Sequence, residues 1–180
     1  MSWAESKLFT QRLILRSIQD SDLQNIYRGL SNPKVIKHYG VSFSSLEETK
    51  EQMDWYRQLQ ENETGMWFAM GLKDSNEFIG AVGLNDMSKE HKRGELGFWL
   101  LPEFWGSGYI SEVVPKVLEY GFQTLDLHRI EAWVETDNEN SRKVLSRLGF
   151  RHEGTLRDHE IKNGKFISVD VFASIVDNFV

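Results

Sequence analysis

A turn that carries two glycines, Trp105-Gly106-Ser107-Gly108-Tyr109-Ile110, constrains the fold of this chain more than any other stretch. The segment before it, residues 94–101, is short, apolar and aromatic and ends at a proline, which is typical of a strand. The segment after it carries apolar residues at helical spacing from residue 113 to residue 122. The turn is therefore predicted to join a strand to a helix, and its glycines permit the positive φ angles that a sharp reversal needs.

The start of this helix is a candidate anion site. The first turn of a helix leaves about four N–H groups without intrahelical partners and carries a partial positive charge, and glycines let a ligand approach the backbone. A tight turn without any ligand is the commoner meaning of two such glycines. The pattern is not a P-loop, because no Gly-Lys-Ser/Thr follows, and a dinucleotide fingerprint would have a further glycine near Ser111.

Length and composition favour one globular domain. The chain has 180 residues, of which 40% are hydrophobic and 27% charged, and it contains no cysteine, which excludes disulfides, thiolate metal sites and a cysteine nucleophile. No apolar run approaches the ~18 residues of a membrane span and the N-terminus lacks a signal core, so we expect a cytoplasmic protein without a membrane partner. The net charge of −6 argues against sequence-independent nucleic-acid binding. The histidines show no metal-ligand spacing, so we expect no metal.

The remaining patterns predict a mixed α/β domain. Capping boxes begin two helices at Ser21 and Ser45, Asn32-Pro33 ends the first of them, and Pro115 favours a regular third helix starting near Ser111. The predicted strands cover residues 8–15, 66–72, 78–84, 94–101, 128–135, 155–162 and 165–175, and a last helix covers 138–148. The strands at 66–101 form an antiparallel meander, and Asn163-Gly164 is a strong hairpin signal. The strand–helix–strand unit over 94–135 predicts a parallel pair with a right-handed crossover.

Four motifs, in order along nearly the whole chain, resemble those of the GCN5-related N-acetyltransferases (GNAT), and within them the ribosomal-protein N-terminal acetyltransferase type called RimJ/RimL-like. The motifs are Leu8-x-Thr10-x-Arg12-Leu13-x-Leu15-Arg16, the segment 94–99 that runs into Trp105-Gly106-Ser107-Gly108-Tyr109, Asn138-x-x-Ser141, and Leu148-Gly149-Phe150 with Glu153-Gly154. Four ordered motifs are far more specific than one pair of glycines.

The resemblance implies a single N-acetyltransferase domain over residues 1–180, with a core of about 8–176. Its sheet would be mostly antiparallel and splayed at a central parallel strand pair, with helices on both faces. Acetyl-CoA would be the co-substrate, with its pantetheine arm bonded to the backbone near Phe98, Trp99 and Leu100. Its diphosphate would lie on the N–H groups of Trp105, Gly106, Ser107, Gly108, Tyr109 and Ile110, and Asn138 and Ser141 are further contact candidates. A plain helix-entry residue is an equally good interpretation of Asn138.

Acetyl transfer to an amine needs a neutral amine and stabilisation of a tetrahedral oxyanion. Without a cysteine, direct attack in a ternary complex is favoured. Glu160, which matches the carboxylate position of the RimL-like pattern and is predicted to lie opposite Ile167, is the first candidate base. An exposed strand glutamate is an equally good interpretation. Glu95 is the second candidate, acting through a water.

The acid and the acceptor are less well defined. Ser141 is either the acid, a cofactor contact or a helix cap, and Leu145 occupies the position where many superfamily members have a tyrosine acid. A non-catalytic acyl-CoA-binding sensor of the same fold is therefore the alternative. The acceptor is an amine, either a protein N-terminus, for example of a ribosomal protein, or a small amine. Residues 35–43 are a candidate substrate wall, although a plain loop is the commoner meaning of such a segment. A homodimer suits this type of protein, but no residue of the sequence supports it.

Overall fold

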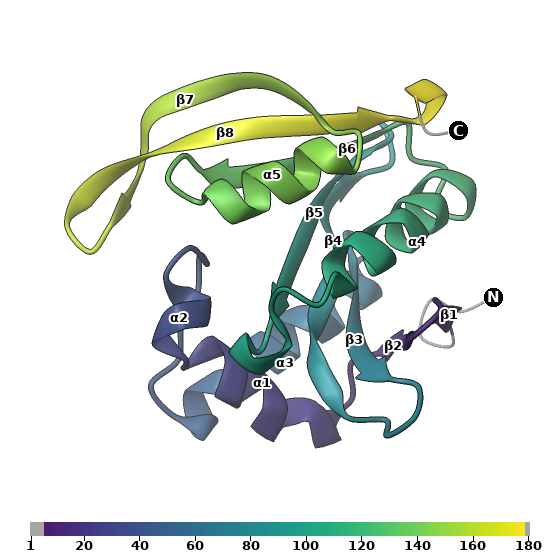
Figure 1. The fold of residues 1–180 in the computed structure, drawn as a ribbon, viewed down its shortest axis with the longest axis vertical. Coiled ribbons are helices and arrows are strands. Elements are labelled where there is room, and N and C mark those ends of the chain that lie inside the picture. Colours follow the sequence, from purple (N-terminus) through teal and green to yellow (C-terminus); the bar gives the residue numbers. More distant parts are fainter. Residues whose placement is uncertain (1–5, 179–180) are drawn as a thin grey trace.

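The computed structural model describes residues 6–178, which fold into one eight-stranded sheet with helices on both faces (Figure 1). The strands are β1 (Leu8–Phe9), β2 (Leu13–Ser17), β3 (Met66–Leu72), β4 (Phe78–Ser88), β5 (Arg93–Leu100), β6 (Arg129–Glu135), β7 (Arg151–Lys162) and β8 (Lys165–Ile175). The helices are α1 (Leu23–Leu30), α2 (Pro33–Ile36), α3 (Leu46–Glu61), α4 (Tyr109–Gln123) and α5 (Glu139–Arg147). In space the strands lie in the order β1-β2-β3-β4-β5-β6-β8-β7.

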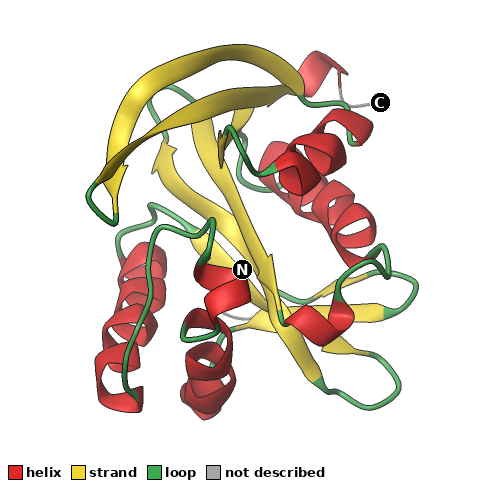
Figure 2. Cartoon of the chain, turned by 60° about the vertical axis from the view of Figure 1, so that its left-hand side comes forward, coloured by secondary structure: helices red, strands yellow, loops and turns green. Residues whose placement is uncertain are grey.

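The centre of the sheet is a parallel pair that separates after three residues. Strands β3 to β5 form the predicted antiparallel meander, and β2 extends it by pairing antiparallel with β3. The parallel pairing of β5 with β6 covers only Arg93 to Glu95 opposite Arg129 to Glu131, and beyond it the strands diverge (Figure 2). The predicted parallel pair and the splayed sheet are therefore confirmed. From Leu96 onward β5 pairs with β4 alone, so one edge of its backbone has no neighbouring strand.

Two hydrophobic clusters fix the sheet between its helices. The larger one packs α4 against the sheet and includes Phe68, Leu84 and Val117. The second joins α1 and α3 to the opposite face around Trp67 and Trp99, both nearly fully buried. Because each face of the sheet is covered, strands β3 and β4 are almost continuously buried, as their apolar sequences require.

Trp67 lies flat across the sheet because its neighbours are glycines. Trp67 is in register with Gly83 on β4, which in turn is in register with Gly97 on β5. A Cβ atom on Gly97 would lie 2.6 Å from the Trp67 ring, and one on Gly83 would lie 2.5 Å from it. The two glycines therefore leave the space through which the indole reaches β5.

Some local predictions are confirmed and others are wrong. Ser45 caps α3 by accepting from the N–H of Glu48 at 3.1 Å, and Asn163 and Gly164 take the positive φ angles of a tight hairpin. Ser21 is not a cap, because Asp22 instead accepts from the backbone N–H of Gln19 at 2.8 Å. Helix α1 ends at Leu30, just before Asn32-Pro33 as predicted, and a further short helix, α2, starts at Pro33.

The first predicted strand is in fact two strands. Residues 8–9 and 13–17 pair with each other, because Thr10 closes a turn between them. The N–H of Thr10 donates to the Leu13 carbonyl at 3.0 Å, and its hydroxyl oxygen accepts from the Leu13 N–H at 3.0 Å. The expected start of α4 near Ser111 is also wrong, since the helix begins at Tyr109 and contains Pro115. Because Pro115 has no N–H, the carbonyl of Ser111 lacks its helical hydrogen bond. Ser111 is exposed, so water can donate to this carbonyl instead.

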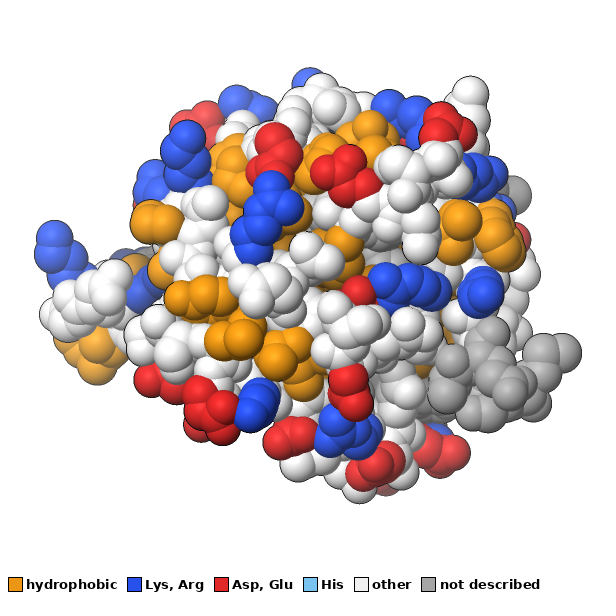
Figure 3. Space-filling view, turned by 90° about the horizontal axis from the view of Figure 1, so that it is seen from below, with side chains coloured by type: hydrophobic (Ala, Val, Ile, Leu, Met, Phe, Trp, Pro, Cys, Tyr) orange, Lys and Arg blue, Asp and Glu red, His pale blue; other side chains and the backbone are white. Residues whose placement is uncertain are grey.

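The hairpin of β7 and β8 extends beyond the body of the molecule, at the left of Figures 1 and 3. Two cross-strand partners near its tip, Ile161 and Phe166, are 68% and 66% exposed. β7 begins at Arg151, earlier than expected, and two bulges bend it over α5. Among the described helices, none is long and apolar enough to cross a bilayer.

Candidate functional site

A cleft of about 760 Å³ opens where β5 and β6 diverge. Its walls carry several aromatic side chains, and among the described residues that line it there is no lysine or arginine. Its carboxylates are Glu51 and Glu95. The aromatic side chains that line it are Tyr39, Phe43, Trp55, Trp67, Phe98 and Trp133. Such a cavity suits a ligand with apolar parts and a positively charged group.

The predicted glycine turn lies between the end of β5 and the start of α4. Gly106 and Gly108 have φ angles of 74° and 78°, so both adopt the left-handed region that favours glycine. Gly108 is the N-cap of α4 and no side chain caps it. No backbone hydrogen bond outside the regular elements starts at the N–H groups of residues 106 to 110 in the described chain. The first turn of α4 therefore presents donors to a ligand.

The end of β5 carries the three residues predicted to bind the pantetheine arm. Phe98 lines the cleft, whereas the side chains of Trp99 and Leu100 are buried in the two hydrophobic clusters. The carbonyl of Leu100 already accepts a hydrogen bond from the indole N–H of Trp105 at 2.9 Å. Trp105 thereby attaches the glycine turn to the end of β5, a role that the sequence did not indicate.

Asn138 and Ser141 both line the cleft at the start of α5. Asn138 is the N-cap and its side chain accepts from the backbone N–H of Ser141 at 3.3 Å, so its helix-entry role is confirmed. The cap role considered for Ser141 belongs to Asn138, and the Ser141 hydroxyl has no hydrogen-bond partner among the described residues. Leu145, in place of the usual tyrosine, is fully buried and lines the same cleft.

Glu95 lies at the point where β5 and β6 separate, opposite Glu131. Burial and, to a lesser degree, the nearby charges of Asp86, Glu131 and Glu160 together raise its pKa to about 7. A carboxyl group with a pKa near 7 is suited to accept a proton at neutral pH. Burial also holds the pKa of the Tyr39 hydroxyl, on the opposite wall, well above its usual range.

Glu160 lies outside the cleft lining. It is opposite Ile167 in the hairpin, as predicted from the Asn163-Gly164 turn, but its side chain is exposed. It is nevertheless close enough for its charge to influence Glu95. Its role as a base stays a prediction, and the geometry favours Glu95 for that role.

A polar cluster ties the candidate substrate wall to the hairpin. Glu135 accepts from the ring nitrogen Nδ1 of His38 at 2.9 Å and from the ammonium of Lys162 at 2.5 Å, and Lys162 also donates to the Lys37 carbonyl at 2.6 Å. Ligand atoms of His38, Glu135 and Asp137 lie within 4.8 Å of one another, yet the Lys162 ammonium already neutralises Glu135. These residues are far apart in the sequence, so no local pattern signals their contact.

Comparison with known proteins decides the family. The model of the acetyltransferase (GNAT) domain matches residues 12–151. The chain belongs to the GNAT acetyltransferases. It is 37% identical over 169 residues to the uncharacterized N-acetyltransferase YoaA of Bacillus subtilis, with 93% of this chain and 96% of that one covered. The family and the enzyme class predicted from the four motifs, an acyltransferase of the N-acetyltransferase type, are confirmed.

Solved structures agree in fold. RimL, a ribosomal L7/L12 alpha-N-protein acetyltransferase in complex with coenzyme A, superposes with a TM-score of 0.87 at 23% identity, covering 96% of this chain and 99% of that one. A spermidine N-acetyltransferase of Vibrio cholerae, in complex with CoA and spermine, gives a TM-score of 0.84 at 23% identity, covering 93% of this chain and 98% of that one. The GNAT fold of this chain, with its splayed parallel pair, is thereby established.

Proposed function

We propose that this GNAT enzyme transfers the acetyl group of acetyl-CoA to a primary amine by direct attack in a ternary complex. The observation that carries the proposal is the continuity of two features, the unpaired edge of β5 and the uncapped glycine turn that follows it. The first offers strand-like partners to the amides of pantetheine, and the second offers N–H groups to the diphosphate. Two related folds, RimL and the spermidine enzyme, were solved with CoA, which supports this cofactor.

In this proposal Phe98, Trp99 and Leu100 bind pantetheine through their backbone, and residues 106 to 110 bind the diphosphate. The N–H of Trp105, also expected to bind it, already donates to the carbonyl of Pro102 at 3.2 Å. Asn138 and Ser141, at the start of α5, lie beside the thiol end of the arm, since both line the same cleft as Phe98. Coenzyme A supplies an acetyl thioester. The chain contributes a groove that orients the arm and walls that exclude water.

Glu95 is the proposed base. The protonated amine first loses one proton to Glu95, directly or through a water, and Glu95 releases it to solvent. The neutral nitrogen then forms a bond to the thioester carbon, the carbon–sulfur bond breaks, and the nitrogen gives its second proton to Glu95. The departing thiolate takes a proton from solvent, either directly or through the Ser141 hydroxyl, which regains its proton from water. Glu160, the candidate implied by the family resemblance, is placed outside the cleft and acts on this step through its charge on Glu95.

The acceptor site carries two carboxylates and several aromatic side chains but no lysine or arginine among its described lining. It therefore suits an amine that arrives with a positive charge. A protein N-terminal α-amine, with a pKa of about 7.7–8.0, costs only about 1 kcal/mol to deprotonate at pH 7, against about 4–5 kcal/mol for a lysine-like amine. A base of pKa about 7 is better matched to the small cost of deprotonating an α-amine than to the larger cost for a lysine-like amine. We therefore favour an N-terminal α-amine, such as that of a ribosomal protein, over a polyamine.

A thiol-release assay with acetyl-CoA and an amine panel tests the proposal. The panel contains peptides with free N-termini, the same peptides with blocked N-termini, spermidine and lysine. We expect release that requires a free N-terminus. Tight CoA binding without turnover on any amine would instead support a non-catalytic sensor, for which the absence of the usual tyrosine at Leu145 is the specific observation.

A further inference from the structure

The turn between β1 and β2 is attached to the first turn of α4, about a hundred residues further along the chain. Three donors meet the carboxylate of Glu112. The backbone N–H of Arg12 and the hydroxyl of Thr10 donate to Oε1 at 2.7 Å and 2.5 Å, and Nε of Arg12 donates to Oε2 at 2.7 Å. Burial alone would raise the pKa of Glu112, but these hydrogen bonds outweigh it and the pKa lies below its usual range. The carboxylate is therefore held ionised and fixed.

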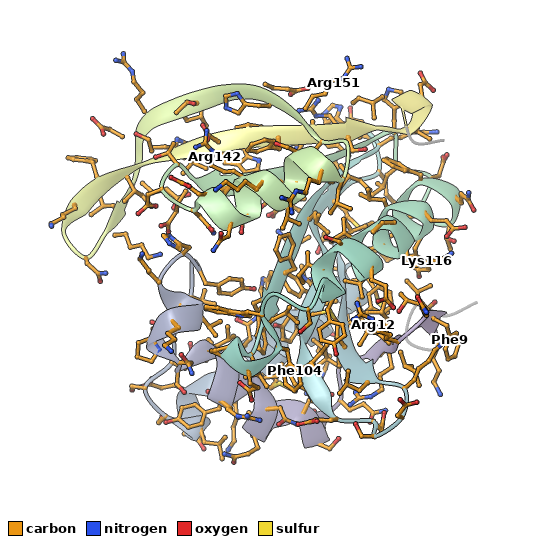
Figure 4. The ribbon with its side chains drawn as sticks, viewed as in Figure 1. Phe9, Arg12, Phe104, Lys116, Arg142 and Arg151 are labelled. Atoms are coloured by element: carbon orange, nitrogen blue, oxygen red, sulfur yellow. The ribbon has the colours of Figure 1, made fainter. Side chains whose placement is uncertain are left out.

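Arg12 also reaches into the glycine turn, beside the N-terminal end of α4 (Figure 4). Its Nη1 donates to the carbonyl of Ser107 at 3.0 Å, and its guanidinium lies 4.4 Å from the centre of the Tyr109 ring. Its Nη2 is close to Gly108, where a Cβ atom would be 3.7 Å away, and it has no hydrogen-bond partner among the described residues. Two of the turn's residues, Ser107 and Tyr109, are thus held by one side chain.

These contacts point to a role in cofactor binding rather than in folding alone. A turn with two glycines at positive φ loses much conformational freedom when a ligand orders it, and a contact that orders it beforehand removes that cost from binding. The Arg12 side chain is 44% exposed, so its free N–H groups remain accessible to a ligand at the turn. A guanidinium is well suited to phosphate oxygens.

We propose that Arg12 is a positioning residue for acetyl-CoA. It holds the carbonyl of Ser107 and the ring of Tyr109 so that the N–H groups of the turn face the diphosphate, and it directs Nη2 at a phosphate oxygen. This inference rests on the proposed cofactor, but it concerns a residue outside the turn whose role neither the spacing of the glycines nor the cleft lining indicates.

Binding and turnover with two acetyl donors test the inference. Acetyl-CoA carries the diphosphate, whereas S-acetylpantetheine lacks it. For Arg12→Met we expect the Kd for CoA, measured by calorimetry, to rise about ten- to a hundredfold, the usual effect of losing a hydrogen bond to a charged group. We expect kcat/KM with S-acetylpantetheine to remain unchanged. Lys116→Met is the matched control, because Lys116 lies on the same helix and pairs only with Glu119 in the described structure.

Further variants separate the outcomes. Arg12→Lys, which keeps the charge without the forked geometry, should recover part of the affinity. The loss should persist with dephospho-CoA, because it concerns the diphosphate and not the 3′-phosphate. Should Arg12→Met not fold, Glu112→Gln should still weaken CoA binding several-fold. Equal losses with both acetyl donors, or an unchanged Kd for CoA, would overturn the inference. A wild type that binds CoA with this Arg12 dependence but acetylates no amine would refute the proposed function alone.

Discussion

The assignment of Glu95 as the base makes the sharpest prediction of the structure. Its carboxyl group has an ordinary pKa of 4.5 that the fold raises to about 7, first by burial and then by the charges of Asp86, Glu131 and Glu160. The rate of acetyl transfer should therefore rise with pH through about 7, as Glu95 loses its proton. Glu95→Gln should lower kcat by about 10²–10⁴-fold, the usual contribution of a general base.

Neighbouring carboxylates should move this titration without abolishing it. Glu160→Gln removes one negative charge near Glu95, so the midpoint of the pH–rate profile should shift to lower pH while the plateau rate stays nearly unchanged. Asp86→Asn should shift it further, since Asp86 has the larger effect. The acceptor amine titrates identically with every variant, so its contribution cancels in the comparison.

The same pKa shift has a consequence for stability. Because the folded-state pKa of Glu95 lies above its unfolded value, the native protein binds more protons than the unfolded chain between pH 4.5 and about 7. Stability should therefore fall as pH rises through that window, by about 3 kcal/mol at most. Urea unfolding at pH 5 and pH 8 should show this loss for the wild type and not for Glu95→Gln.

Abolished turnover in Glu160→Gln, with an active Glu95→Gln, would refute the assignment of Glu95 as the base.

Three further variants probe the rest of the site. Gly108→Ala should destabilise the protein by about 1–2 kcal/mol in thermal unfolding and raise the KM for acetyl-CoA, since the φ of 78° at Gly108 is unfavourable for any side chain. An unchanged KM would show that the turn does not bind the cofactor. Ser141→Ala should lower kcat about tenfold, the worth of one hydrogen bond, without changing the melting temperature, because Asn138 and not Ser141 supplies the cap; a lower melting temperature would show a structural role. Lys162→Met should raise the KM for the acceptor several-fold and leave the KM for acetyl-CoA nearly unchanged, because Glu135 loses its ammonium partner at the substrate wall. Equal changes in both KM values would argue against a local effect.

Local signals were sufficient for much of the fold. The strand, glycine turn and helix around Gly108, the cap at Ser45 and the hairpin at Asn163 each depend on residues that are adjacent in the sequence. The parallel pairing of β5 and β6 follows from the strand–helix–strand order, because such crossovers have one usual geometry. By contrast, the division of the first strand at Thr10 depends in part on Glu112, a contact that no local pattern contains.

The candidate site was only half predictable for the same reason. The glycine turn can be predicted from its composition, whereas the raised pKa of Glu95 arises from burial and from carboxylates on other strands. Hairpin register correctly placed Glu160 opposite Ile167, but register does not determine exposure when bulges bend the strand. The contact of Arg12 with Ser107 and that of His38 with Glu135 each join segments about a hundred residues apart, so only the folded chain reveals them.

The central claim is that the diphosphate of coenzyme A lies on the backbone N–H groups of the glycine turn. Amide NMR of the labelled protein during a CoA titration tests it most directly. We expect the resonances of Gly106, Gly108 and Tyr109 to shift downfield in proportion to saturation, as N–H groups that gain a phosphate acceptor do. Saturation of CoA binding with those three resonances unmoved, and shifts confined to another part of the chain, would contradict the account.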